Sequence, residues 1–62
     1  MIYIEVVFVG KDGKRTCEEK TFDDCRKALR FMHAMRRKGN LISGWRTDDA
    51  DDNEYLWERW HY

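Results

Sequence analysis

A run of alternating β-branched residues near the N-terminus constrains the fold more than any other feature. Period-two alternation predicts a strand with two distinct faces, and Ile and Val are residues that strands prefer. We therefore expect a strand across residues 2–9. Its first face comprises Ile2, Ile4, Val6 and Phe8, and its second face comprises Tyr3, Glu5, Val7 and Val9.

A turn signal follows this strand. Residues 10–13 read Gly-Lys-Asp-Gly, and the Asp-Gly pair tolerates the positive φ angles of a primed hairpin turn. Residues 14–20 should therefore return antiparallel to residues 2–9. Most of them are charged, which is typical of an edge strand that is protected against pairing with other sheets.

From residue 22 to residue 38 the apolar residues recur at helical spacing, which predicts a helix with one apolar side. Thr21 is the expected N-cap, with Asp24 three residues later in a variant of the capping box. The Gly39-Asn40 pair is the expected stop. The apolar stripe comprises Phe22, Cys25, Ala28, Leu29, Met32 and Met35.

Residues 41–47 are expected to form a third strand that returns beside the first, which gives the strand order 2-1-3. The chain has room for one core, so residues 1–62 are predicted to form a single small β-β-α-β domain of the α+β class. Residues 51–62 are expected to form a short helix or a fourth strand. The helix is favoured because Glu58 interrupts the strand alternation.

One helix covers only one face of a sheet, so Tyr3, Val7 and Val9 on the second face need another cover. Two candidates are the C-terminal segment and a second copy of the protein in a symmetric homodimer. Aromatic residues make up 15% of the chain and dominate both cores and interfaces, so the tryptophans are either core or contact residues. The candidate protein interface comprises Tyr3, Val7, Val9, Trp45, Trp57 and Trp60.

Charge is balanced in total but not along the chain. There are 12 Lys and Arg against 12 Asp and Glu, so net charge predicts no partner, yet residues 25–47 contain no acidic residue. The basic stripe on the predicted helix is either a solvated face or a site for nucleic-acid phosphates or an acidic partner. It comprises Arg26, Lys27, Arg30, His33, Arg37 and Lys38.

The charge inverts after residue 47. The acidic cluster there is either a solvated turn that caps a last helix or a docking patch that faces a basic protein or imitates nucleic-acid phosphates. It comprises Asp48, Asp49, Asp51, Asp52 and Glu54.

Metal sites fit the sequence poorly. From Asp49 the chain matches the first half of an EF-hand loop, but Glu54 stands at the glycine position and Trp60 stands where a bidentate carboxylate is needed. The four Cys and His residues are not arranged in the close pairs of a structural zinc site. No metal and no cofactor is therefore predicted.

The remaining features indicate a binding protein and no enzyme. Ser43 is the one serine, and the sequence does not place a His-carboxylate pair where it could activate this residue as a nucleophile. No small-molecule substrate is therefore evident. The chain shows no leader and no apolar run long enough for a membrane span. We therefore expect a cytoplasmic protein with reduced thiols, in which Cys17 and Cys25 are buried as small hydrophobes.

These observations predict a small non-enzymatic accessory or regulatory protein that binds another macromolecule, most of all a protein. The alternative, from a different class, is a nucleic-acid-binding domain that uses the basic side of its helix. The size also fits a regulator or inhibitor encoded by a mobile element.

Overall fold

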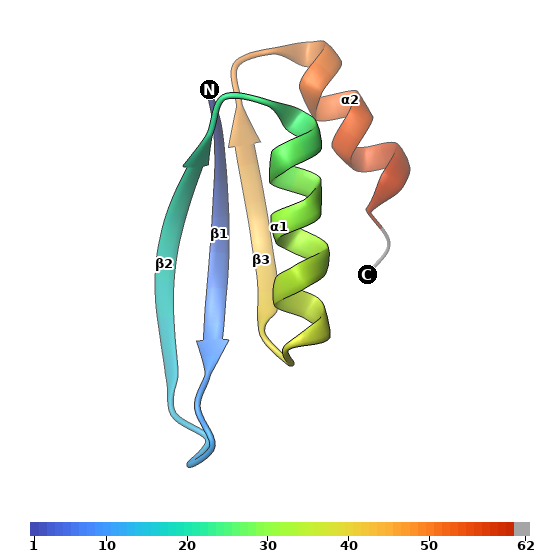
Figure 1. Cartoon of the computed structure of the whole chain (residues 1–62). Coiled ribbons are helices and arrows are strands. Elements are labelled where there is room, and N and C mark those ends of the chain that lie inside the picture. Colours follow the sequence, from blue (N-terminus) through green and yellow to red (C-terminus); the bar gives the residue numbers. More distant parts are fainter. Residues whose placement is uncertain (61–62) are drawn as a thin grey trace.

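The computed structural model describes residues 1–60 and has three antiparallel strands and two helices (Figure 1). The elements are β1 (Ile2–Val9), β2 (Arg15–Phe22), α1 (Cys25–Arg37), β3 (Leu41–Thr47) and α2 (Ala50–Arg59). Strand β1 lies in the centre, in the order β2-β1-β3. This confirms the predicted α+β fold and strand order.

The hairpin between β1 and β2 closes differently from the prediction. The Gly10 N–H donates to the carbonyl of Lys14 over 2.8 Å, and the Gly13 N–H donates to the carbonyl of Gly10 over 3.0 Å. Within residues 1–60, Gly13 (φ 84°) and Gly39 are the positions with positive φ. A primed type I turn would also need positive φ at Asp12, so the predicted turn type is wrong, although Gly13 supplies the left-handed residue.

Strand β2 is longer than predicted, and this displaces the start of the helix. Thr21 and Phe22 pair with Tyr3 and Ile2 in the sheet, so the predicted Thr21 cap is wrong. The N-cap is Asp24, whose Oδ1 accepts the Arg26 N–H over 2.8 Å. Sheet pairing therefore takes precedence over the local capping signal.

Helix α1 ends in the predicted Gly-Asn pair. Gly39 has φ 87°, and the Asn40 N–H donates to the carbonyl of Met35 over 2.9 Å, the pattern of a Schellman motif. The Asn40 side chain then accepts the Val9 N–H over 3.0 Å. This bond fixes the end of β1 beside the start of β3.

The C-terminal segment is helical, as favoured, from Ala50 to Arg59. Its N-cap is Asp49, which accepts the N–H groups of Asp51 and Asp52, so the helix starts before the expected Asp51. The predicted segment also included His61 and Tyr62, which lie outside the described residues.

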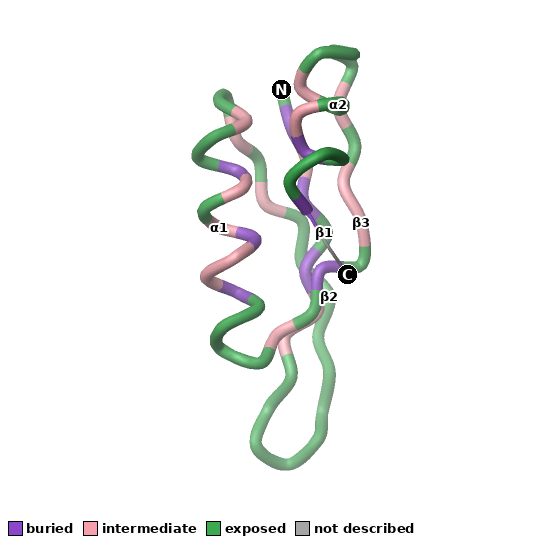
Figure 2. Tube along the Cα trace, turned by 90° about the vertical axis from the view of Figure 1, so that its right-hand side faces the viewer, coloured by how far each residue is buried: buried purple, intermediate pink, exposed green. Residues whose placement is uncertain are grey.

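The core lies on one side of the sheet only (Figure 2). Helix α2 contacts both α1 and β3, and Leu56 and Trp60 are buried in the same cluster as the first face of β1. The expectation that the C-terminal segment could cover the second face is therefore wrong. The buried cluster comprises Ile2, Ile4, Val6, Ala28, Met32, Met35, Ile42, Leu56 and Trp60.

Candidate binding surfaces

The side of the sheet away from both helices is covered by neither of them, and we call it the outer face. Strand pairing determines its membership, because residues opposite each other in the register share a face. It comprises Tyr3, Glu5, Val7 and Val9 of β1, Arg15, Cys17, Glu19 and Thr21 of β2, and Leu41, Ser43, Gly44 and Arg46 of β3.

An apolar row crosses the outer face. Val7 pairs with Cys17 on one side and with Leu41 on the other, and Val9 lies two residues further along β1. Leu41 is 48% exposed and Val9 is 37% exposed, and Cys17 is also exposed. This row presents apolar surface to solvent without cover from any described residue of the chain.

The rows on either side of this apolar row differ in charge. On one side Glu5 and Glu19 are directly opposite each other, an unfavourable pairing of like charges. Arg46 offsets it in part, since it lies 3.3 Å from the Glu19 carboxylate and 4.5 Å from the centre of the Tyr3 ring. On the other side Arg15, opposite Val9, makes no ion pair with any residue in 1–60.

The tryptophans predicted as interface residues lie elsewhere. Trp45 and Trp57 make an edge contact at 5.2 Å between ring centroids, and Trp57 is 60% exposed. Trp60 is buried, with the His33 ring at 5.2 Å and the Arg36 guanidinium at 5.3 Å. The predicted interface therefore divides into Tyr3, Val7 and Val9 on the outer face and three tryptophans on the helical side.

The predicted basic stripe on α1 is largely exposed. Lys27 pairs with Asp23 over 3.5 Å, and His33 is half-buried against Trp60, so these two residues are partly engaged. The rest of the stripe makes no ion pair within the part of the chain that the structure describes. This remaining group comprises Arg26, Arg30, Arg37 and Lys38.

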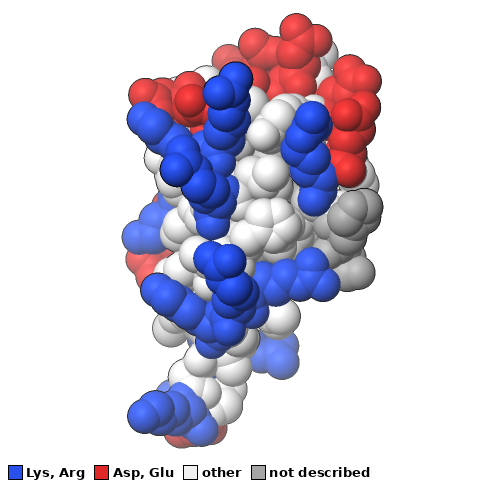
Figure 3. Space-filling model, turned by 45° about the vertical axis from the view of Figure 1, so that its right-hand side comes forward, with Lys and Arg blue, Asp and Glu red and all other residues white. Residues whose placement is uncertain are grey.

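The predicted acidic patch lies at the start of α2. Asp49 caps that helix, and Asp48 lies 3.6 Å from the N-terminal amino group. Figure 3 shows acidic groups gathered at the upper end of the molecule, with basic groups over α1 and toward the hairpin. In residues 1–60 no three His, Cys, Asp or Glu side chains come together in a group that could hold a metal ion.

The two cysteines have different environments. Cys17 is exposed on the outer face, so the prediction that both cysteines are buried is wrong for this residue, while Cys25 is half-buried at the start of α1. Burial raises the pKa of the Cys25 thiol above its ordinary value, and a hydrogen bond to Asp52 and the negative charge of that residue raise the pKa further. At neutral pH the Cys25 thiol is therefore mostly protonated, which is its less nucleophilic form.

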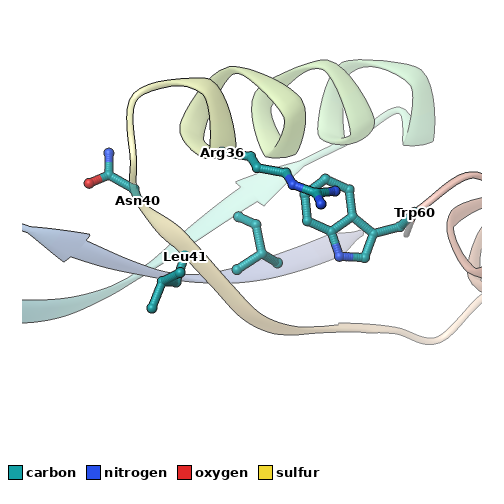
Figure 4. Close-up of a pocket in the computed structure, with 5 residues that line it drawn as sticks. Arg36, Asn40, Leu41 and Trp60 are labelled. Carbon is teal, nitrogen blue, oxygen red and sulfur yellow. The ribbon is translucent and has the colours of Figure 1, made fainter. Parts of the chain in front are cut away.

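A shallow hollow of about 220 Å³ lies between the end of α1 and Trp60 (Figure 4). Its polar lining is already engaged, because the Asn40 amide bonds to Val9 and Met35 and the Arg36 guanidinium lies over Trp60. The Leu41 side chain points away from Trp60. A second hollow, of about 320 Å³, lies on the outer face beside Glu5 and Cys17.

Sequence reasoning missed the outer-face roles of Arg15, Cys17, Glu19 and Leu41. Pairing the hairpin about the expected Asp12-Gly13 turn would place Cys17 opposite Phe8 on the first face, whereas the observed register places it opposite Val7. Leu41 could not be placed in this way, since a register shift between Glu5 and Val6 changes the pairing of β1 with β3.

No protein-family model, curated protein or solved structure matches this chain. Within residues 1–60, neither helix has the length and apolar character that crossing a membrane requires.

Proposed function

We propose that this chain is a small, non-enzymatic regulatory or accessory protein that acts by binding another protein through the outer face of its sheet. One observation carries the proposal: both helices pack on the same side, which leaves the apolar row uncovered. An antiparallel sheet commonly has one solvated face, but such a face is usually polar. Here it holds Val7, Val9 and Leu41.

The charges beside the apolar row define the chemistry of the partner. A complementary surface is apolar opposite Val7 and Leu41. It brings a cation to the Glu5 and Glu19 carboxylates and an anion to Arg15, since opposite charges across an interface fix its register and disfavour other partners.

We place this activity in the cytoplasm. Cys17 is exposed and free, and a free exposed thiol persists best where glutathione and thioredoxin keep thiols reduced. The same thiol lies in the apolar row, so it reports directly on whether the outer face is covered.

Alkylation of Cys17 tests the proposal. A maleimide reagent is added to the isolated protein at nanomolar concentration and, in parallel, to an extract of the cells that produce it, and the modification of Cys17 is followed by mass spectrometry. We expect at least tenfold slower modification in the extract, because a bound protein excludes the reagent. Equal rates in both settings would contradict the proposal.

A matched control places the reporter on the other side of the molecule. In an Arg26→Cys variant that also carries Cys17→Ser, the new thiol lies on the exposed side of α1. It should be modified at the same rate in the extract as in isolation, apart from general scavenging of the reagent. Equal protection at both positions would show that the slowing is not specific to the outer face.

A second candidate function is the binding of nucleic acid through α1. Arg26, Arg30 and Arg37 are exposed and make no ion pair within the described residues. At about 1.5 Å per residue they span roughly 16 Å along the helix, a length over which a row of cations can neutralise several phosphates. The balanced total charge weakens long-range attraction, so we rank this candidate second.

A further inference from the structure

We propose that the protein bound by the outer face is a second copy of this chain, which is turned over about a two-fold axis that runs along the row Cys17-Val7-Leu41. The inference rests on the proposed function, because it names the partner of that same surface. A two-fold interface must be self-complementary. The outer face meets this condition at Val7 and Leu41 in the apolar row and at Arg15 and Glu19 beside it.

The apolar row lies on the axis. When one sheet is turned over onto the other about this row, Val7 meets Val7 and Leu41 meets Leu41 of the second copy. Sheets that pack face to face are about 10 Å apart and within about 30° of alignment. The apolar row, which is uncovered in the single chain, is therefore buried at the centre of the pair.

The charged rows exchange places under the same rotation. Glu19 lies two residues from Cys17 on one side, and Arg15 lies two residues from it on the other. Turning the sheet over brings Arg15 of each copy opposite Glu19 of the other, so the symmetry creates two identical ion pairs. Within the chain Glu19 pairs with Arg46, so each Glu19 receives a second cation in the pair, while Glu5 of each copy comes opposite Val9 of the other.

The charge at the two ends of the molecule favours this axis over the other in-plane axis. Asp48 and the start of α2 lie at one end of the sheet, and the hairpin lies at the other, where Lys14 pairs with Asp12 and Lys11 remains in excess (Figures 1 and 3). An axis along the strands would bring like ends together. The axis along the row brings the acidic end of one copy toward the basic end of the other, which is the favourable arrangement.

The size of the outer face determines how tightly the two copies should bind. The row lies near one end of the sheet, so the copies overlap over residues 5–9 of β1 and 15–19 of β2 and at Leu41. Strand spacings of about 4.8 Å and a rise of about 3.3 Å per residue then give a footprint of roughly 200 Å². A standard interface buries about 800 Å² per partner. The pair should therefore be weak, with a dissociation constant in the micromolar range or above, and the isolated protein is a monomer at nanomolar concentration.

Charge reversal tests the proposal without depending on a single variant. Arg15→Glu places like charges opposite each other in its own pair, and so does Glu19→Arg. A mixture of the two variants restores both ion pairs. We expect each variant alone to associate at least tenfold more weakly than the wild type in sedimentation equilibrium, and the equimolar mixture to recover the wild-type affinity as a heterodimer. Both residues are exposed, and circular dichroism of each variant verifies its fold.

Cross-linking locates the axis. Because the pair is weak, the Cys17 thiol of a dissociated copy can react first. In a Cys25→Ser variant, a bis-maleimide with a spacer shorter than the roughly 10 Å between packed sheets should then join Cys17 of one copy to Cys17 of the other. An Arg30→Cys variant without the native cysteines should give no product above the level of diffusional encounter. Equal products from both variants would overturn the proposed axis.

The outcomes separate this inference from the function on which it rests. If the mixture of charge-reversed variants and the wild type all remain monomeric while Cys17 is protected in the cell extract, the second-copy inference is wrong and the partner is a different protein. If Cys17 is also unprotected in the extract, the proposed function is wrong as well. Association of both the wild type and the mixture, with weaker association of each charge-reversed variant alone, supports the inference.

Discussion

Trp45 donates a hydrogen bond from Nε1 to the side-chain oxygen of Asn53 over 3.0 Å. The bond joins β3 to α2, and Trp57 on the same helix packs against the edge of the Trp45 ring. Helix α2 is short, and an isolated helix of its length is marginal in water. Contacts of this kind therefore hold it over the core.

Removing this hydrogen bond should weaken the fold measurably. Asn53→Ala leaves the Trp45 N–H without this acceptor, and we expect a loss of about 1 kcal/mol in the free energy of unfolding, measured by urea denaturation. Glu54→Ala is the control, because Glu54 is exposed and makes no hydrogen bond or ion pair within residues 1–60. Equal losses from the two substitutions would show that helix propensity, and not the bond, is responsible.

Leu56 should contribute far more to stability than its neighbour Trp57. Leu56 is fully buried and Trp57 is 60% exposed, so Leu56→Ala creates a cavity in the shared core. We expect a loss of about 3 kcal/mol for Leu56→Ala and of about 1 kcal/mol or less for Trp57→Ala, whose ring contact is partial. The reverse order in urea denaturation would mean that α2 presents its other side to the core.

The reactivity of Cys25 should reflect its raised pKa. The thiolate is the nucleophile, so in a Cys17→Ser variant the pH of half-maximal alkylation of Cys25 should lie above its ordinary value of 9.0. Asp52→Asn removes a nearby negative charge and should lower that pH. A midpoint at or below the ordinary value, measured by the rate of maleimide addition across pH, would contradict the packing of α2 over the start of α1.

The second candidate function makes a separate prediction about salt. If α1 binds nucleic acid through four or five phosphate contacts, the logarithm of affinity should fall with the logarithm of salt concentration with a slope of roughly −3 to −5. Reversal of Arg30 and Arg37 to Glu should weaken binding equally for all sequences, whereas Arg59→Glu on α2 should have a smaller effect. Fluorescence anisotropy that detects no binding to DNA or RNA at low salt would exclude this function.

The sequence predicted the elements better than it predicted their ends. Alternation located β1, and the helical stripe located α1, because each pattern extends over many residues. The start of α1 was misplaced since Thr21 is a good cap by local chemistry, yet its pairing with Tyr3 depends on the sheet as a whole. Local sequence patterns carry no information about this tertiary contact.

The candidate surfaces were predicted only in part. The uncovered second face followed from the alternation of Tyr3, Val7 and Val9 alone. The burial of Trp60 and the exposure of Cys17 did not follow, because each depends on which side of the sheet α2 occupies. A short helix with apolar residues on several sides gives no sequence signal for that choice.

Sedimentation equilibrium of the wild-type protein from one micromolar to one millimolar tests the central claim most directly. The account predicts a mass that rises from the monomer value of 7.6 kDa toward twice that value. It also predicts a Leu41→Lys variant that stays monomeric because it places a charge in the apolar row. Added salt should weaken the wild-type pair without abolishing it, since the contact is partly ionic. A wild-type mass of 7.6 kDa at every concentration would contradict the claim that a second copy covers the outer face.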